Sequence, residues 1–336
     1  MCPSMILGFS QGAMGVPQVW TRSRGFVRLG AIGVLIALVG CGSRPSSDAH
    51  LQSASRAAMV KSEASGAGAA KPANPSVVQY STRTIEGAIV HVVAVPAGRG
   101  WVVSPALAET VQPIEDFVKQ QPGAIAAINA GFFDPENQGS TSFVMRGRQW
   151  VADPRQNRRL MENPSLQPYL PQILDRSELR RYRCGGAVPE TQYEIVRHGA
   201  VVAVGCELLE AIGAGPQLLP QLTATEEGFW AERQGQVIRD AIGVEGRNAR
   251  SAIGLAADGR VWLVMVAQSE PTGGVSLRGL ADLLRSLGAD RGLNLDGGTS
   301  SALYFQGRKF EGKVDENGRS ASRPVKSVLL VKPEND

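Results

Sequence analysis

The chain has 336 residues, four cysteines and a formal net charge of +4. That length is enough for a sizeable hydrophobic core and for one or two domains. The first 40 residues contain Arg22, Arg24 and Arg28 but no acidic residue, so most of the net charge belongs to the N-terminus. The remainder is close to neutral, which excludes a general electrostatic case for nucleic-acid binding.

The N-terminal segment has the order of features typical of an export signal. Three arginines precede an apolar run over residues 29–39, which ends at Gly40-Cys41. About 20 apolar residues are needed to span a bilayer comfortably, so this run fits a signal peptide better than a transmembrane helix. Leu38-Val39-Gly40-Cys41 resembles a bacterial lipobox, a signal in which the cysteine is lipidated and becomes the new N-terminus.

We therefore predict a lipoprotein signal peptide over residues 1–40 and lipidation of Cys41. The protein would be exported and anchored to a membrane through that lipid, in the periplasm or at the cell surface. The alternative is an ordinary signal peptide or anchor in which Cys41 has no role. Residues 41–80 are rich in Ser, Ala, Gly and Pro, and this composition predicts a disordered tether.

The cysteines beyond the tether predict a disulfide. Cys2 falls in the leader and Cys41 is the proposed lipid site, which leaves Cys184 and Cys206. Two remaining cysteines in an exported chain favour one disulfide, and two buried free thiols are the alternative. Neither cysteine has a histidine or cysteine nearby at ligand spacing, so we expect no zinc site.

Periodicity predicts strands and short helices in the first half of the domain. A β-branched run over residues 89–95 and an apolar run over residues 124–129 predict strands, and residues 111–120 predict a short helix. Prolines recur within residues 152–190, which we interpret as an elaboration with one short helix over residues 173–182. Its arginines could face an anion, but we favour a solvated helix face; they are Arg176, Arg180, Arg181 and Arg183.

The second half predicts further strands and one longer helix. Two strands are expected within residues 193–204, and Asp258-Gly259 predicts a hairpin between residues 249–255 and 261–268. Ser276 is a candidate N-cap for a helix that ends at Gly288. A strand is then expected at residues 292–295, a hairpin over residues 302–309 and a final strand at residues 327–331. We predict one α+β domain over residues 81–334, with a mixed, strand-rich sheet and a few packed helices.

The run from Leu293 to Ser301 is the strongest candidate site. An apolar alternation leads into Asp296, then Gly297-Gly298, then three hydroxyl residues. A carboxylate at a strand end can act as nucleophile, general base or metal ligand. The glycines let a ligand approach the backbone closely, and the hydroxyls offer hydrogen bonds around it.

Five short motifs occur along the chain in an order that resembles one family. They are Asn129-Ala130-Gly131-Phe132-Phe133, Gly213-Ala214-Gly215-Pro216-Gln217-Leu218, Arg250-Ser251-Ala252-Ile253-Gly254, the run from Asn294 to Ser301, and Arg323-Pro324-Val325. Together they resemble the phosphodiester glycosidase domain, the catalytic domain of the lysosomal uncovering enzyme, over roughly residues 85–332. Ala130 and Thr299 stand where the family pattern has glycine, so we expect them to narrow the pocket or to change the sugar accepted.

The resemblance implies hydrolysis of a glycosyl-1-phosphodiester at the anomeric carbon. Phosphate is a good leaving group, so such a site needs charge stabilisation on phosphate and a carboxylate near the anomeric centre. We therefore expect Arg250 to bind phosphate and Asp296 to act as base or nucleophile, with no cofactor or metal. The expected substrate contacts are Asn129, Gly131, Phe132, Gly215, Gly297, Gly298, Ser300 and Ser301.

Two other functions remain compatible with the sequence. The first is a metal-dependent phosphodiesterase with Asp296, Asp134 and Asn129 as ligands, although the chain lacks a histidine-and-carboxylate cluster. The second is a non-catalytic envelope protein that binds glycans or supports export of exopolysaccharide. In each case the expected partner is a sugar phosphodiester or an envelope glycan.

The lipobox resemblance yields the first test. The substitution Cys41→Ser removes the thiol that would carry the lipid, so labelling of the expressed protein with radioactive palmitate should be lost. Wild-type protein expressed in the same host is the control. Labelling that persists in Cys41→Ser would contradict the lipoprotein prediction.

Overall fold

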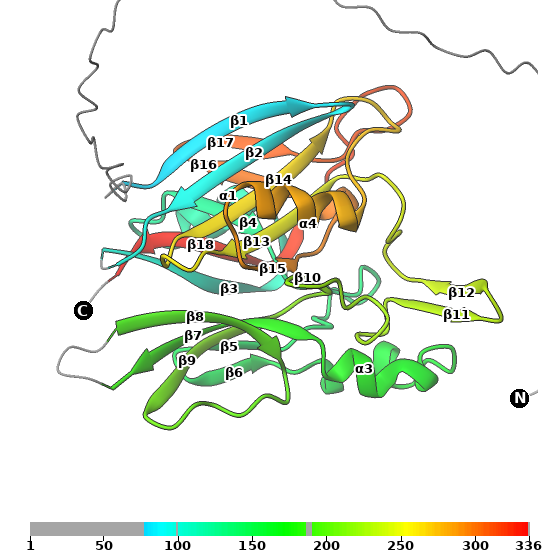
Figure 1. The fold of residues 1–336 in the computed structure, drawn as a ribbon, viewed down its shortest axis with the longest axis horizontal. Coiled ribbons are helices and arrows are strands. Elements are labelled where there is room, and N and C mark those ends of the chain that lie inside the picture. Colours follow the sequence, from blue (N-terminus) through cyan, green and yellow to red (C-terminus); the bar gives the residue numbers. More distant parts are fainter. Residues whose placement is uncertain (1–76, 99, 186–189, 335–336) are drawn as a thin grey trace, which may run out of the picture. The chain divides into compact units, whose positions relative to one another are not determined.

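The computed structural model describes residues 77–98, 100–185 and 190–334 (Figure 1). These residues all belong to one compact unit. The predicted signal peptide, Cys41 and nearly all of the predicted tether lie outside the described residues. Strand β1 already begins at Gln79, just before the predicted start of the domain. None of the helices in the described residues is both long and apolar enough to cross a membrane.

A six-stranded sheet joins the first two strands of the domain to four strands from its second half. Helix α4 packs against it, with Leu277, Leu280 and Leu284 fully buried. The hydroxyl of Ser276 accepts a hydrogen bond from the amide of Gly279, as its predicted role as N-cap requires. In spatial order the strands are β1 (Gln79–Ile85), β2 (Ala88–Val95), β14 (Val261–Gln268), β13 (Arg250–Leu255), β15 (Arg291–Asn294) and β10 (Gln217–Leu219), and the helix α4 spans Leu277–Ser286.

A second, five-stranded sheet packs against the first. Buried side chains of both sheets share one core, including Val93, Ile253 and Leu263 from the first sheet and Ile128 and Leu329 from the second. Helix α1 (Ile114–Lys119) contacts this second sheet. Its strands in spatial order are β17 (Arg308–Glu311), β16 (Ala302–Phe305), β4 (Ala126–Asn129), β18 (Val325–Pro333) and β3 (Trp101–Gln112).

A third sheet and a short hairpin complete the strands. The sheet has the order β6 (Gln149–Ala152), β5 (Val144–Arg146), β9 (Cys206–Gly213), β7 (Ser177–Cys184) and β8 (Glu190–Arg197). The hairpin is β11 (Trp230–Arg233) and β12 (Gln236–Asp240), and the segment between β6 and β7 holds the short helices α2 (Arg158–Met161) and α3 (Leu170–Leu174).

The α+β class is confirmed, but the sheets differ from the expected single mixed sheet. Every strand pairing within the described residues is antiparallel. Strands β14 and β15 are joined by α4, but β13 lies between them and pairs antiparallel with both. The strand–helix–strand order in the sequence indicated a parallel pair of strands. In the sheet these two strands, β14 and β15, are separated by β13.

The predicted helix over residues 173–182 is wrong. Helix α3 ends at Leu174, and the following residues form β7, which pairs with both β8 and β9. The arginines of this segment do not form a solvated face: Arg180 is buried with Glu178 at 2.6 Å, and Arg181 pairs with Glu210 at 2.8 Å. Pairing with strands distant in sequence overrides local helix propensity here.

Two smaller boundaries also differ from the prediction. Strand β3 continues to Gln112, and α1 begins at Ile114, directly after Pro113. Proline has no amide hydrogen to donate within a helix but is tolerated at its start. The second strand expected before Val204 is also absent: β8 ends at Arg197 and β9 begins at Cys206.

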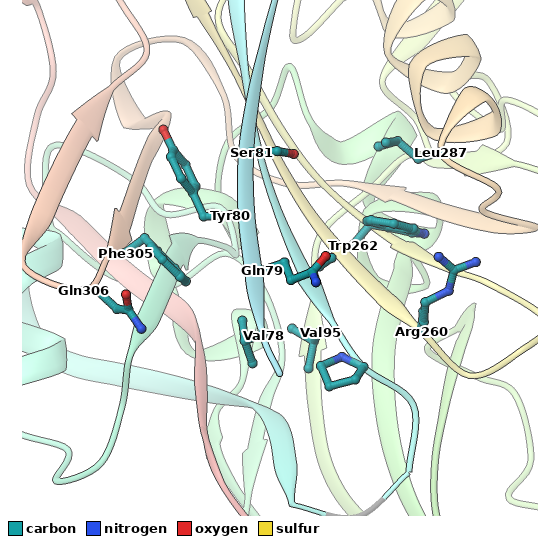
Figure 2. A pocket seen from close by; sticks show the side chains of 12 residues that line it. Val78, Gln79, Tyr80, Ser81, Val95, Arg260, Trp262, Leu287, Phe305 and Gln306 are labelled. Atoms are coloured by element: carbon teal, nitrogen blue, oxygen red, sulfur yellow. The ribbon is translucent and has the colours of Figure 1, made fainter. Parts of the chain in front are cut away.

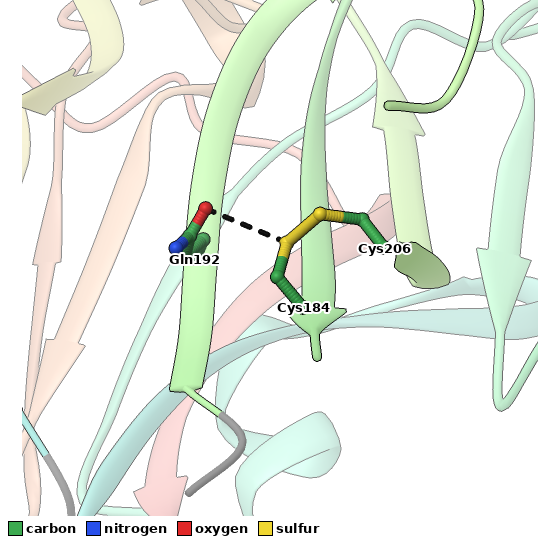
Figure 3. Close-up of a disulfide and its surroundings, with 3 residues drawn as sticks. All are labelled: Cys184, Gln192 and Cys206. Carbon is green, nitrogen blue, oxygen red and sulfur yellow. Dashed lines mark hydrogen bonds between the residues drawn. A yellow bond between two sulfur atoms is a disulfide. The ribbon is translucent and has the colours of Figure 1, made fainter. Parts of the chain in front are cut away.

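The predicted disulfide between Cys184 and Cys206 is confirmed. The two cysteines are cross-strand partners at the end of β7 and the start of β9 (Figure 3). The bond joins residues 22 positions apart in sequence. It therefore ties together two strands whose connection includes the whole of β8.

The disulfide predicts a measurable contribution to stability. Replacing both cysteines by serine should lower the free energy of unfolding by about 3 kcal/mol, because the bond restricts a loop of about 20 residues in the unfolded chain. Chemical denaturation of the wild type and of the double variant measures the difference. Reductant should lower the stability of the wild type and leave that of the variant unchanged. Equal stability of the oxidised wild type and the variant would contradict the prediction.

Candidate active site

The two most informative sequence motifs meet where the first two sheets adjoin. The run after β4 and the run after β15 come from different sheets, yet the amide of Asp296 donates to the carbonyl of Ala130 at 2.8 Å. The side-chain amide of Asn129 donates to the carbonyl of Asp296. These bonds fix the backbone of Asp296 at the end of its strand.

The carboxylate of Asp296 is largely buried and interacts with the Gly297 amide, Arg323 and Ser300. The amide of Gly297 donates to its Oδ1 at 2.9 Å, and Nη2 of Arg323 lies 3.6 Å from its Oδ2. The side chain of Asp296 is 12% exposed. Burial raises its pKa to about 6, against the opposing effects of Ser300, Arg323 and the Gly297 amide. This is a carboxylate that ionises near neutrality and faces a cation.

Arg323 is the functional candidate that the sequence analysis missed. Its Nε donates to the hydroxyl of Ser300 at 2.9 Å, and its amide donates to the carbonyl of Thr299 at 2.8 Å. The guanidinium lies 4.6 Å from the centre of the Phe133 ring, and the side chain is 35% exposed. Arg323 belongs to the last of the five motifs, but no local pattern says that the chain before β18 returns to Asp296.

A second cation, Lys313, lies close to the turn formed by Gly297 and Gly298. Nζ of Lys313 donates to Oδ1 of Asn248 at 3.1 Å, and a Cβ on Gly298 would lie 3.6 Å from Nδ2 of the same asparagine. The amide of Ala321 donates to the carbonyl of Lys313 at 2.9 Å, so the loop between β17 and β18 delivers both Lys313 and Arg323. Within the described residues Lys313 has no carboxylate within 4.0 Å.

The turn after Asp296 leaves backbone and small groups around the carboxylate. Gly298 has a φ of +61°, a left-handed conformation that favours glycine. Gly297 and Gly298 are half-buried, whereas Ser300 is fully buried beneath them. Ser300 connects Arg323 to Asp296 and so positions these two side chains. It does not itself face solvent.

Arg250 does not take the expected role of phosphate ligand. It lies beside the turn, since a Cβ on Gly297 would be 3.9 Å from its Cδ, but the guanidinium is directed elsewhere. It is buried and donates to the carbonyls of Val275 at 3.1 Å, Ile242 at 2.9 Å and Gly246 at 2.8 Å, and also to Gly243. Burial lowers its pKa to about 10. Arg250 therefore holds the loop before β13 in place.

Asn129 is likewise structural, against the expectation that it holds a sugar hydroxyl. Its side chain is fully buried. Its Oδ1 accepts from the Ser251 hydroxyl at 2.6 Å and from the Ala302 amide at 3.0 Å, and its Nδ2 is occupied by Asp296. Both ends of the amide are thus committed to the protein.

Three further predicted substrate contacts are buried by packing. A Cβ on Gly131 would lie 3.1 Å from the carbonyl of Gly213, and one on Gly215 would lie 2.3 Å from Oε2 of Glu227. Ser301 is fully buried, and its hydroxyl has no hydrogen-bond partner among the described residues. Close packing requires glycine at the first two positions, and all three residues are buried. The Ala130 side chain also lies in the core and narrows no pocket, whereas Thr299 is half-buried at the turn.

Phe132 lines a cavity of about 290 Å³ next to the turn. Phe133 lines it too, and the same ring lies under Arg323, so the cavity begins one residue away from the Asp296–Arg323 pair. The predicted residues Asp296, Gly297, Gly298 and Ser300 therefore gather at one site, with Phe132 beside it. Asp296 and Arg323 form the charged pair of this site.

A larger cavity lies elsewhere and lacks comparable chemistry. It has a volume of about 620 Å³ and is lined by residues of β1, β2 and β14 together with Phe305 and Gln306 (Figure 2). Figure 2 shows Arg260 and Trp262 at its wall, but no carboxylate lines it. None of the predicted site residues contributes to it. A volume without an acid or nucleophile gives no basis for catalysis.

The alternative metal site is not supported by the arrangement of its proposed ligands. The described residues contain no group of three or more His, Cys, Asp or Glu side chains that could hold a metal ion. The amide of Asn129 is committed to the protein, and Asp134 pairs with Arg159 at 2.8 Å. Asp296, Asp134 and Asn129 therefore do not present free oxygens to one ion.

Comparison with known proteins identifies the family of the chain. The sequence matches the phosphodiester glycosidase family over residues 122–332, a stretch that includes Asp296 and Arg323. The chain belongs to this family. Comparison with curated proteins gives no match.

Two solved structures have folds that resemble the fold of this chain. A zebrafish N-acetylglucosamine-1-phosphodiester alpha-N-acetylglucosaminidase catalytic domain, auto-inhibited by its pro-peptide, is similar with a TM-score of 0.53 and 15% identity, over 78% of this chain and 85% of that chain. A hypothetical protein from Synechocystis is similar with a TM-score of 0.50 and 21% identity, over 76% of this chain. This chain spans 62% of the length of the Synechocystis protein. At these identities the likeness shows the fold alone.

The buried carboxylate predicts a pH-dependent gain in stability when its charge is removed. Because the folded-state pKa of Asp296 is about 6, against 3.8 ordinarily, ionisation opposes folding increasingly as pH rises through this interval. Asp296→Asn should therefore raise the free energy of unfolding by up to about 3 kcal/mol at pH 7 and by little below pH ~4. Chemical denaturation at pH 4, 5, 6 and 7 measures this dependence.

The exposed pair of Asp282 and Arg285 provides the control. Asp282→Asn removes one negative charge at the surface and should give no comparable gain between pH 4 and 7. A stability difference between Asp296→Asn and the wild type that stays constant with pH would show that ionisation of Asp296 does not oppose folding.

Proposed function

We propose that this protein hydrolyses a glycosyl-1-phosphodiester at the anomeric carbon. The observation that carries the proposal is the Asp296–Arg323 pair, a nearly buried carboxylate 3.6 Å from a half-exposed guanidinium. A sugar phosphodiester brings together an electrophilic carbon and an anionic leaving group. The pair offers one group for each of them.

The chemistry requires a carboxylate near the sugar and positive charge near the phosphate. The bond between the anomeric carbon and the phosphate oxygen breaks, and the phosphate monoester leaves with the electron pair. Water supplies the hydroxyl that ends on the sugar. Asp296 either attacks the anomeric carbon first or takes the proton of the attacking water, and retention or inversion of anomeric configuration distinguishes these two routes.

Arg323 is the group that we assign to the departing phosphate, in place of Arg250. Its guanidinium lies over Phe133, its Nε is bonded to Ser300 and its Nη2 lies 3.6 Å from Asp296, while the side chain is 35% exposed. Lys313, across the glycine turn, adds a second positive charge. Positive charge that is already in place stabilises the developing phosphate charge without reorganisation of solvent.

The proposed class of substrate rests on the predicted export signal. With residues 1–40 removed and a lipid on Cys41, the site would be presented to the cell envelope at the end of a tether. A sugar phosphodiester of an envelope glycan or of an exopolysaccharide is then the substrate class that we propose. Glycan binding without cleavage, in support of exopolysaccharide export, is the alternative function that the following experiment separates from hydrolysis.

Removing either member of the pair should abolish most of the activity. Release of reducing sugar from synthetic sugar phosphodiesters should fall at least about 100-fold in Asp296→Asn and in Arg323→Gln, since one charge-aligned group commonly contributes that much. The acid limb of wild-type kcat/KM should lie near pH 6, the pKa of Asp296. In Arg323→Gln it should move to higher pH, because Arg323 lowers that pKa.

Two exposed residues outside the site provide matched controls. Asp282→Asn and Arg308→Gln should retain the wild-type rate. Wild-type rates in Asp296→Asn would contradict the assigned mechanism. Binding of the diesters by the wild-type protein without release of sugar would establish the alternative, a glycan-binding protein.

A further inference from the structure

The cavity beside the active site contains arginines that the proposed reaction does not use. Arg159, Arg176 and Arg239 line it, together with one carboxylate, Asp134. Asp134 and Arg159 neutralise each other at 2.8 Å. Arg176 and Arg239 have no carboxylate within 4.0 Å among the described residues. The lining therefore has an excess of positive charge.

The two uncompensated arginines are held in the same way and lie near each other. Nε of Arg176 donates to the carbonyl of Glu227 at 3.1 Å, and Nε of Arg239 donates to the next carbonyl, that of Gly228, at 2.7 Å. Each guanidinium also stacks on an aromatic ring: Arg176 lies 3.7 Å from the centre of Phe229, and Arg239 lies 4.6 Å from that of Tyr169. One bond and one stacking contact thus fix the plane of each group.

This fixation leaves the outer edge of each guanidinium available. No hydrogen bond within the described residues uses the two terminal nitrogens of Arg176 or of Arg239. Such an edge presents parallel N–H groups that match the oxygens of a carboxylate or a phosphate. Because stacking and the Nε bond have already ordered the side chains, less conformational entropy is lost on binding.

The nearest charges compensate the positive charge of Arg176 only in part. The carboxylate of Glu227 is fully buried and is bonded to Ser177, Gln217 and Thr223. Burial lowers the pKa of Arg176 to about 9, Glu227 raises it and Arg239 lowers it further. The two arginines thus repel each other in a partly buried cavity. A bound anion would relieve that repulsion.

We propose that this cavity binds a second anionic group on the substrate, a carboxylate or a phosphate on the sugar phosphodiester that is cleaved at Asp296. The proposal rests on the proposed function for the link to cleavage. Phe132 and Phe133 line the cavity and provide apolar surface for a sugar ring between the two anionic groups. The substrate class is then an acidic sugar phosphodiester, one that carries negative charge in addition to the scissile phosphate.

The test measures binding, so that it does not depend on turnover. Calorimetry with the full-length protein compares three probes: glucose 1-phosphate, glucuronic acid 1-phosphate and glucose 1,6-bisphosphate. At least one of the two doubly acidic probes should bind about 10- to 100-fold more tightly than glucose 1-phosphate, as expected for a hydrogen bond to a charged group. A preference for glucuronic acid 1-phosphate indicates a carboxylate site, and a preference for the bisphosphate indicates a phosphate site.

The variants locate the preference in the cavity. Arg239→Gln and Arg176→Gln should each remove most of it while changing the affinity for glucose 1-phosphate less than twofold. Arg308→Gln is the matched control, because Arg308 also stacks on an aromatic ring, 5.1 Å from Phe310, but lies outside the cavity. This variant should keep the wild-type preference.

Three results would overturn the proposal. They are equal affinity of the wild type for all three probes, no binding of either doubly acidic probe, and an equal loss of affinity for all probes in Arg239→Gln. The last result would mean that the cavity holds the anomeric phosphate itself. Failure of diester hydrolysis with the preference intact would instead count against the proposed function and leave the anion site standing.

Discussion

The buried amide of Asn129 is the interaction on which the site depends. It accepts from Ser251 of the first sheet and from Ala302 of the second, and it donates to the backbone of Asp296. Leaving a buried donor or acceptor without its partner costs about 1–3 kcal/mol per group, so these bonds hold the two sheets in a defined relation. The site is built on that relation, because its loops come from both sheets.

The second constraint is the balance of charge around Asp296. Burial opposes ionisation of its carboxylate, while Arg323, Ser300 and the Gly297 amide favour it. The result is an acid with a pKa of about 6, which is ionised at neutral pH but remains sensitive to its neighbours. Groups of this kind are typical of functional sites, where a fold accepts a cost in stability for reactivity. The two arginines have different roles: Arg250 is buried and bonded to loop carbonyls, whereas Arg323 is 35% exposed and pairs with Asp296.

The neighbouring cavity extends the same division of roles. Arg180 and Arg181 of β7 are compensated by carboxylates and serve the fold. Arg176, directly before the same strand, is held by a carbonyl and an aromatic ring, and its outer edge stays available. What distinguishes a structural arginine from a binding one here is how many of its donors the protein already uses. That quantity depends on neighbours from distant parts of the chain.

The sequence alone determined those elements whose capping, turn or strand patterns lie within a few neighbouring residues. Ser276 and Gly288 delimit helix α4, Asp258-Gly259 forms the hairpin between β13 and β14, and the carboxylate after β15 belongs to the site. These features follow from capping, turn conformation and strand patterning, which act over a few residues. The cysteine count likewise sufficed to pair Cys184 with Cys206, and the five ordered motifs sufficed to indicate the family.

The tertiary structure decided which polar residues face a ligand and which hold the protein together. Sequence patterning placed Arg250 and Asn129 beside the site correctly. The side chains of both residues, however, form their hydrogen bonds with backbone groups and buried side chains of the protein. Arg323 carries no local mark of function and reaches Asp296 because β18 pairs within the second sheet. Segment 177–182 became a strand for the same reason, since β8 and β9 supply its partners. Hydrogen bonds are satisfied by whatever lies nearby in space, so their assignment depends on contacts between residues far apart in sequence.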